Sequence, residues 1–207
     1  MTVEEYFVDE LALIREAAQG DLDSFNRLVL AYQDMVYNQA YRLLGDPEGA
    51  ADAAQETFVS AYNHLRSFRG GSFKAWLLRI TTNTCYDELR RQKRRPTQPL
   101  EPVDDEDEEI ESPTWLADPS ASPEEQLEQK EVSQAIQDCL EGLPLEFRAV
   151  VVLVDLQGLD YAEASQAIGK PLGTVKSRLA RARMRLQDCL HGYWELLPSI
   201  FRPIGES

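Results

Sequence analysis

A proline-rich and strongly acidic segment in the middle of the chain constrains its fold more than any other feature. Residues 96–123 carry six prolines, and the run "DDEDEE" occupies residues 104–109. Prolines interrupt regular elements and neighbouring carboxylates repel one another, so such a segment cannot bury enough apolar surface to offset the entropy of ordering. We therefore predict a flexible linker over residues 96–122, with a folded part on each side of it.

The charge of the chain is distributed in blocks. The formal net charge is −15, yet residues 66–95 carry nine cations against two acids, and residues 170–185 contain no acid at all. A net charge this negative argues against binding to nucleic acid, but the average conceals a basic, acidic, basic order along the chain. This order predicts two separate parts that each contact a polyanion.

The cysteines, histidines and apolar runs limit the classes of protein to which the sequence can belong. Cys85, Cys139 and Cys189 are far apart and form no CxxC pair, and His64 and His191 lack partners at metal-ligand spacing. We expect reduced thiols, no metal site and no cofactor. No apolar run approaches eighteen residues and no charged-then-apolar leader opens the sequence, so we expect a soluble, cytoplasmic protein.

Apolar residues at helical spacing predict an all-α protein. The first part, residues 1–95, is expected to hold helices over 9–21, 24–46, 48–65 and 73–95, of which the last is weakened by the β-branched run "ITTNT". The second part, residues 123–190, is expected to begin with a helix at Ser122-Pro123 and to continue through a core helix at "RAVVVLVD". Residues 191–207 form an apolar extension.

The stretch "YAEASQAIGKPLGTVKSRLARARMRL" predicts a helix-turn-helix over residues 161–186. A short helix ends at Gly169, which permits a left-handed turn, and Pro171 is expected to begin the second helix. One side of that second helix is apolar, and the other presents Thr174, Lys176, Ser177, Arg178, Arg181 and Arg185. A helix that reads the major groove of DNA needs this division, although a basic helix face can also be merely solvated.

These residues resemble a known family. "DAAQETFVSAY", "SFRGGSFKAWLLRITTNTCYDELRR", "LPLEFRAVVVLVDLQGLDYAEASQAIG" and "GTVKSRLARARMRL" are similar, in this order, to the bacterial extracytoplasmic-function sigma factors. That group of the sigma-70 superfamily holds only regions 2 and 4. The resemblance implies two small helical domains, sigma region 2 at residues 1–95 and sigma region 4 at residues 123–190.

For the first part, the resemblance implies one surface for polymerase and one for DNA. Asp52, Gln55, Glu56 and Phe58 match the helix that docks on the β′ clamp of core RNA polymerase. The loop "FRGGS" and Asn83 match the elements that open the minus-ten promoter element and hold a flipped base, a task suited to an amide that donates and accepts. Arginines at the end of the fourth helix would contact phosphates. The implied minus-ten residues are Phe68, Arg69, Gly70, Gly71, Ser72, Asn83, Arg90, Arg91 and Arg94.

From the residues alone, blander interpretations of the first part stay open. The acidic helix and the basic helix end are each compatible with a solvated surface. Asn83 is compatible with a side chain that caps or interrupts its own helix.

For the second part, the resemblance implies that the helix-turn-helix reads the minus-thirty-five element. Lys176, Ser177, Ala180 and Arg181 match base-reading positions, and Arg178 and Arg185 match phosphate contacts. The implied set is Thr174, Lys176, Ser177, Arg178, Ala180, Arg181 and Arg185. Pro171 stands where the family often has a serine cap, so the helix start is expected to shift by a residue. The extension at 191–207 exceeds the usual end and is expected to pad region 4 or to meet a regulator.

Two further classes of function compete with this interpretation. An autonomous helix-turn-helix regulator would bind a duplex unaided, whereas a sigma factor needs core polymerase. An enzyme has little support, because the sequence offers no paired carboxylates, nucleophile-base pair or phosphate loop. The resemblance implies as partners core RNA polymerase (β′ clamp and β flap), promoter DNA and an anti-sigma factor, with no small-molecule substrate. The linker would thread the polymerase's RNA path or act as a plain tether.

Overall fold

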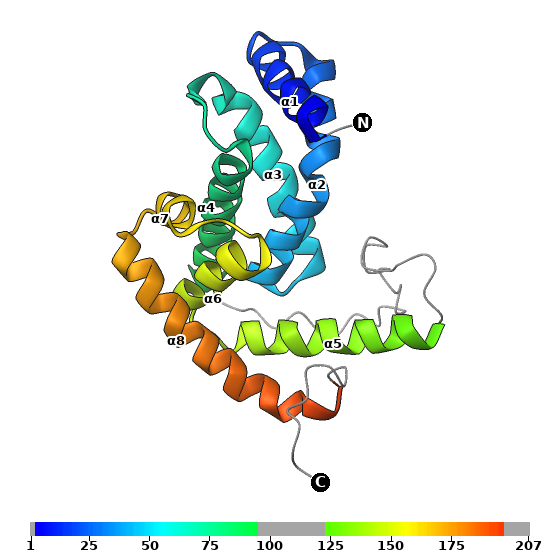
Figure 1. The fold of residues 1–207 in the computed structure, drawn as a ribbon, viewed down its shortest axis with the longest axis vertical. Helices are drawn as coiled ribbons and strands as arrows, with labels where there is room; N and C mark the ends of the chain where they lie inside the picture. The colour runs from blue at the N-terminus through cyan, green and yellow to red at the C-terminus, as the bar shows by residue number, and fades with distance from the viewer. Residues whose placement is uncertain (1–2, 95–122, 197–207) are drawn as a thin grey trace.

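A computed structural model of the chain describes residues 3–94 and 123–196 (Figure 1). Within these ranges it contains helices and turns but no strand, which confirms the all-α fold class. The predicted linker at 96–122 lies outside the described residues, and the predicted domain boundaries stay predictions. The N-terminal part comprises α1 (Val3–Ala18), α2 (Leu22–Leu44), α3 (Pro47–His64), the 3-10 turn η1 (Leu65–Ser67) and α4 (Phe73–Arg94). The C-terminal part comprises α5 (Pro123–Glu141), α6 (Leu145–Val151), the π-helical turn η3 (Val152–Leu156), α7 (Tyr161–Ile168), α8 (Leu172–Leu190) and the 3-10 turn η4 (His191–Leu196).

Glycine and aspartate set the boundary between α2 and α3. Gly45 ends α2 in the left-handed region, at φ 78°, and its N–H donates to the carbonyl of Tyr41 at 2.8 Å. The carboxylate of Asp46 accepts a hydrogen bond of 2.7 Å from the N–H of Gly49, and Pro47 occupies the first turn of α3. Each helix end thus has a partner for a backbone group that the helix itself leaves free.

The β-branched run in α4 stays helical because its hydroxyl groups bond within the helix. Thr81 and Thr82 donate to the carbonyls of Leu77 and Leu78 at 3.0 and 2.8 Å. The Thr82 hydroxyl also accepts a 2.7 Å hydrogen bond from Nε2 of Gln39 on α2. Both threonines are buried, so packing against α2 outweighs the weak helix propensity of the run.

The helix-turn-helix begins with a capping box that the sequence analysis did not identify. The Asp160 carboxylate accepts from the N–H groups of Ala162 and Glu163, both at 2.8 Å, and the Glu163 carboxylate accepts from the N–H of Asp160 at 3.0 Å. Gly169 closes α7 in the left-handed region at φ 62°, as predicted. These contacts fix where α7 starts and where the turn to α8 begins.

Recognition helix α8 starts one residue later than predicted. Pro171 has an extended backbone and lies outside the helix, while its carbonyl accepts from the N–H groups of Thr174 and Val175. It therefore occupies the N-cap position and not the first helical position. The apolar side predicted for this helix is confirmed: Val175, Leu179 and Ala182 are buried.

One hydrophobic core extends through both parts of the chain. Leu43 of α2 and Leu78 of α4 belong to the same buried cluster as Val150 of α6 and Leu179 of α8. Figure 1 shows α2, α3 and α4 side by side, with α5 crossing below them and α8 running diagonally past α6. The predicted core helix at "RAVVVLVD" forms the centre of this cluster, as α6 and the π-helical turn that follows it.

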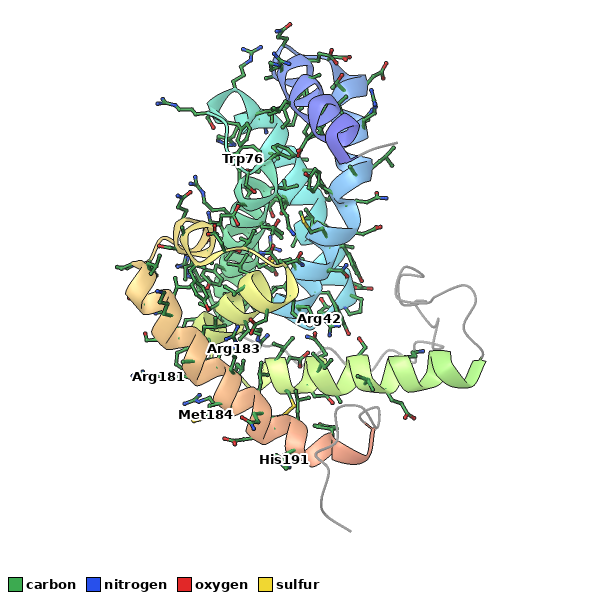
Figure 2. All side chains as sticks on the ribbon, viewed as in Figure 1. Arg42, Trp76, Arg181, Arg183, Met184 and His191 are labelled. Carbon is green, nitrogen blue, oxygen red and sulfur yellow. A yellow bond between two sulfur atoms is a disulfide. The ribbon has the colours of Figure 1, made fainter. Side chains whose placement is uncertain are left out.

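Polar contacts join α2 to α5 beside this core. Nη1 of Arg42 donates to the carbonyl of Ser133 and to Oε1 of Gln137, both at 3.2 Å, and its Nη2 donates to the Ser133 hydroxyl at 3.0 Å. Nε2 of Gln137 donates to the carbonyl of Tyr41 at 3.3 Å. Figure 2 shows Arg42 at this junction. Burial lowers the pKa of Arg42, because desolvation disfavours the charged guanidinium.

The expectation of three reduced thiols is wrong for two of them. Cys139 and Cys189 form a disulfide, and only Cys85 is free among the cysteines. The two cysteines are 50 residues apart in sequence, but α5 packs against α8 and brings their Cα atoms to 5.7 Å. A disulfide can form at this distance, whereas sequence spacing carries no information about it.

The C-terminal extension begins against α5. The Tyr193 hydroxyl in η4 donates to a carboxylate oxygen of Asp138 at 3.4 Å. This contact agrees with an extension that pads the C-terminal part, while residues 197–207 lie outside the described residues. Among the described helices, none has the length and apolarity needed to cross a membrane.

Candidate polymerase and nucleic-acid interfaces

Helix α3 presents an acidic face to solvent. Asp52, Gln55 and Glu56 are exposed and share one side of the helix by their spacing. Phe58 is half-buried and packs against the aromatic core of the N-terminal part. Three of the four predicted polymerase-binding residues therefore share an exposed face, while Phe58 packs against the core. Val59, which the sequence analysis passed over, extends this surface as an exposed apolar side chain.

An aromatic cluster holds the loop before α4. The Phe68 ring lies 5.6 Å from that of Phe73 and 5.5 Å from that of Trp76, between ring centroids. Tyr32 of α2 joins the cluster at 5.4 Å from Phe73. Phe68 is thus an anchor of the loop and not its exposed tip.

The tip of this loop is exposed and depends on glycine. Gly70 and Gly71 have φ of 92° and 90°, a region that other residues rarely adopt. The hydroxyl of Ser72 accepts a hydrogen bond of 3.1 Å from the N–H of Ala75 and so caps α4. Arg69 is exposed beside the glycines. The loop can therefore approach a ligand closely with its backbone, on a base fixed by the aromatic cluster.

Asn83 lies on the exposed side of α4 that continues from this loop. It follows Trp76 by two helical turns, or about 10 Å, and therefore faces the same side. The Trp76 ring contacts that of Phe68 and so links the loop to the side of α4 that carries Asn83. The loop and Asn83 thus lie toward the same side of α4, while Arg90, Arg91 and Arg94 lie further along the helix. Trp76 was not among the predicted residues, although an aromatic residue beside a glycine loop was a usable signal.

The basic end of α4 is partly neutralised by its own acids. Arg90 pairs with Asp87 at 2.9 Å, and Arg91 pairs with Glu88. Side chains of the Arg90 pair are mostly exposed, so the pair contributes little stability and can exchange its partner for a phosphate. Arg94 is also exposed. All three arginines are thus available to a nucleic acid.

The outward face of α8 carries the predicted base-reading residues. Lys176, Ser177, Ala180 and Arg181 are exposed, opposite the buried stripe. Met184 stands next on this face at 60% exposure, and Figure 2 shows Arg181 and Met184 pointing away from the rest of the molecule. Met184 was not among the predicted site residues.

The other cations of α8 are held by neighbouring elements. Arg178 forms an ion pair with Glu146 of α6, and the Arg185 guanidinium lies 5.2 Å from the ring centroid of Phe147. Both therefore flank the exposed face on the side of α6. Arg183, which was not among the predicted site residues, is held on the opposite flank by a 3.0 Å hydrogen bond from its Nε to Asp155. The division between base-reading and phosphate-contacting positions stays a prediction.

One residue from each predicted DNA-binding set, Arg90 and Arg178, lines a shared cavity. A cavity of about 420 Å³ lies between α4 and the C-terminal part. Arg90 and Lys93 of α4 and Lys170 and Arg178 of the helix-turn-helix line it, together with Tyr86. In this arrangement the basic end of α4 faces the recognition helix.

Both halves of the chain match models of one protein family. Residues 28–95 match the model described as Sigma-70 region 2, and residues 133–186 match Sigma-70, region 4. The chain is 38% identical over 172 residues to the ECF RNA polymerase sigma factor SigE of Mycolicibacterium smegmatis, and the match spans 83% of this chain and 63% of that protein. It is 34% identical over 178 residues to the ECF RNA polymerase sigma factor SigW of Bacillus subtilis, spanning 86% and 94% of the two chains.

A solved structure has the same fold. CnrH, in complex with the cytosolic domain of CnrY, is similar with a TM-score of 0.62 and 26% identity over 89% of this chain and 98% of that chain. Sequence, family models and fold therefore agree. This chain belongs to the extracytoplasmic-function sigma factors of the sigma-70 family.

Proposed function

We propose that this chain binds core RNA polymerase through α3 and reads promoters with two separate surfaces. As a member of its family it is a non-enzymatic regulatory subunit that directs transcription initiation at promoters. The acidic face of α3 would dock on the β′ clamp, and α8 with its flanks would read the minus-thirty-five element and meet the β flap. The loop at residues 68–72 together with Asn83 would open and read the minus-ten element. Such work places the chain in the cytoplasm with the polymerase.

The observation that carries this proposal is the two-sided character of α8. Its inner stripe is buried in the core, while its outer face presents small and cationic side chains at the spacing of a groove-reading helix. Small residues at Ser177 and Ala180 let the helix approach base edges, and Arg181 can donate two hydrogen bonds to a guanine. The cations on its flanks suit phosphates on either side of the groove.

Promoter binding on this proposal requires the two parts to separate. The minus-ten and minus-thirty-five elements are about 25 base pairs apart, or roughly 85 Å of duplex at 3.4 Å per base pair. Arg90 and Arg178 instead line the same cavity. We therefore interpret the described arrangement as a closed form, in which Arg90 and Arg178 lie beside one cavity. The anti-sigma partner implied by the resemblance would hold this form, and CnrH in complex with CnrY is a similar fold bound to a protein.

In vitro transcription with core polymerase tests the proposal. Purified chain is added to core enzyme over a library of promoter templates, and specific run-off products are expected only with the chain present. A parallel footprint on duplex DNA without core polymerase separates the alternative, an autonomous regulator. Specific protection by the chain alone, with no effect on run-off transcription, would overturn the proposal.

A further inference from the structure

The disulfide between Cys139 and Cys189 lies apart from the proposed DNA and polymerase surfaces. Cys189 is the penultimate residue of α8, eight residues or about 12 Å along the helix from Arg181. Cys139 lies near the end of α5 and is almost completely buried. Promoter reading makes no use of either sulfur, so the bond calls for a separate explanation.

Helix α5 lies between α2 and the end of α8. The side chain of Gln137 on α5 forms hydrogen bonds with Tyr41 and Arg42 of α2. Cys139, two residues further along α5, faces the opposite side of the helix and forms the disulfide with α8. Tyr193, just beyond α8, adds a hydrogen bond to Asp138. The end of the recognition helix is therefore fastened to the same helix that joins the C-terminal part to the N-terminal part.

We propose that Cys139 and Cys189 form a reversible dithiol–disulfide site whose oxidation fastens the end of the recognition helix to α5. The reversibility of the bond rests on the proposed function, because a sigma factor works in the cytoplasm. Thiols are kept reduced there, and disulfides are chiefly transient and redox-sensing. The oxidant is a peroxide, and the reductant is a low-molecular-weight thiol.

The chemistry of the site balances with one peroxide molecule. The more accessible Cys189 attacks hydrogen peroxide as a thiolate, so an S–O bond forms, the O–O bond breaks and hydroxide leaves. The thiolate of Cys139 then attacks the Cys189 sulfur, so the S–S bond forms, the S–O bond breaks and a second hydroxide leaves. The two protons released when the two thiols ionise convert both hydroxides to water. Two thiols and one peroxide thus give one disulfide and two waters. Two equivalents of a small thiol reverse the reaction by exchange.

Oxidation should change the stability of the helix-turn-helix and leave its DNA face unchanged. The bond closes a loop over residues 139–189, which contains α6, α7 and nearly all of α8. Closing a loop of this length restricts the unfolded chain far more than the folded one. The thermal midpoint of the C-terminal part is therefore expected to rise on the order of 10 °C on oxidation.

Cys85 provides an internal control for these reactions. It is fully buried in the common core, and burial raises the pKa of its thiol to about 12. A buried neutral thiol reacts slowly with peroxide. Its tryptic peptide, residues 80–90, is distinct from the peptides that contain Cys139 (131–148) and Cys189 (186–207).

The experiment treats the full chain with stoichiometric hydrogen peroxide or with dithiothreitol, then maps unreduced tryptic peptides by mass spectrometry and follows melting by circular dichroism. We expect the peptides at 131–148 and 186–207 to be linked only after peroxide, with the Cys85 peptide unmodified. We expect the oxidised chain to melt on the order of 10 °C higher than the reduced one. This difference should vanish in Cys189→Ala, whose altered side chain is half-buried, and persist in Cys85→Ser.

Two outcomes would overturn the inference. One is a peroxide-treated chain in which residues 131–148 and 186–207 stay separate. The other is a linked chain that melts at the same temperature as the reduced chain. Neither measurement involves polymerase or DNA, so either outcome would contradict the redox site without contradicting the proposed sigma-factor activity, which the transcription experiment tests.

Discussion

The guanidinium of Arg148 on α6 donates to the carbonyl of Leu43, in the last turn of α2, at 2.7 Å. Its second amino group donates to the carbonyl of Glu141, the last residue of α5, also at 2.7 Å. One cation thus binds the free carbonyls at two helix C-termini, where the helix dipoles also favour positive charge. Burial lowers the pKa of Arg148, because desolvation disfavours the charged guanidinium. The contact joins the N-terminal and C-terminal parts.

Replacing Arg148 with Met should destabilise the fold. The change keeps much of the apolar stem but leaves two carbonyl oxygens without their charged donor, and we expect a loss of about 2–4 kcal/mol in the free energy of unfolding. Urea denaturation followed by circular dichroism measures it. Arg148→Lys keeps the charge but cannot span both carbonyls, so it should recover only part of the loss. Equal stability of Arg148→Met and wild type would show that the contact contributes nothing.

Replacing Arg42 with Ala should favour separation of the two parts. The substitution removes the three hydrogen bonds to α5 and leaves Gln137 with fewer partners, while the surface for DNA stays intact. We expect a larger radius of gyration by small-angle X-ray scattering. The control is Arg15→Ala, because the Nε of Arg15 donates to the carbonyl of Leu11 within the same helix and makes no link to α5; this variant should keep the wild-type radius. If the Arg42→Ala variant keeps the wild-type radius of gyration, the apolar core alone holds the two parts together.

Arg181 and Arg183 should differ in their effect on DNA. Arg181 stands free on the outward face, so Arg181→Ala should weaken use of the upstream element by about 1–3 kcal/mol if the residue reads a base. Arg183 is engaged by Asp155, whose hydrogen bond raises the pKa of the guanidinium. Arg183→Ala should therefore have the smaller effect on transcription. Transcription from competing templates with different upstream sequences measures the effects of both substitutions. If Arg181→Ala weakens transcription equally from every upstream sequence, Arg181 contacts a phosphate and not a base.

Replacing Asn83 with Ala should impair strand opening without affecting binding to core polymerase. The amide is exposed on α4 and distant in sequence from the α3 face, and a base pocket acts only once the duplex has melted. Permanganate reactivity at the start site measures opening, and gel filtration measures assembly. Asn26→Ala, an exposed amide on α2, is the matched control. An unchanged permanganate pattern would remove Asn83 from the DNA-binding residues.

Most helices and the helix-turn-helix were predictable from the sequence because their signals are local. The apolar stripe of α8 and the left-handed Gly169 follow from periodicity and backbone sterics within a few residues. The helical run through Thr81 and Thr82 depends on tertiary contacts, since β-branched residues disfavour a helix and packing against Gln39 offsets that preference. Resemblance to a family supplied the roles of Asn83 and Arg181, which no local rule assigns.

The sequence by itself determined the all-α class, the positions of the helices and the cations that the outer face of α8 presents. Only the tertiary structure decided which residues from the two parts meet. The contact of Arg148 with Leu43, the shared cavity beside Arg90 and the bond between Cys139 and Cys189 each join residues at least 50 positions apart. Such pairs depend on how whole helices pack in three dimensions, because close packing of side chains, and not spacing along the chain, sets which atoms come together.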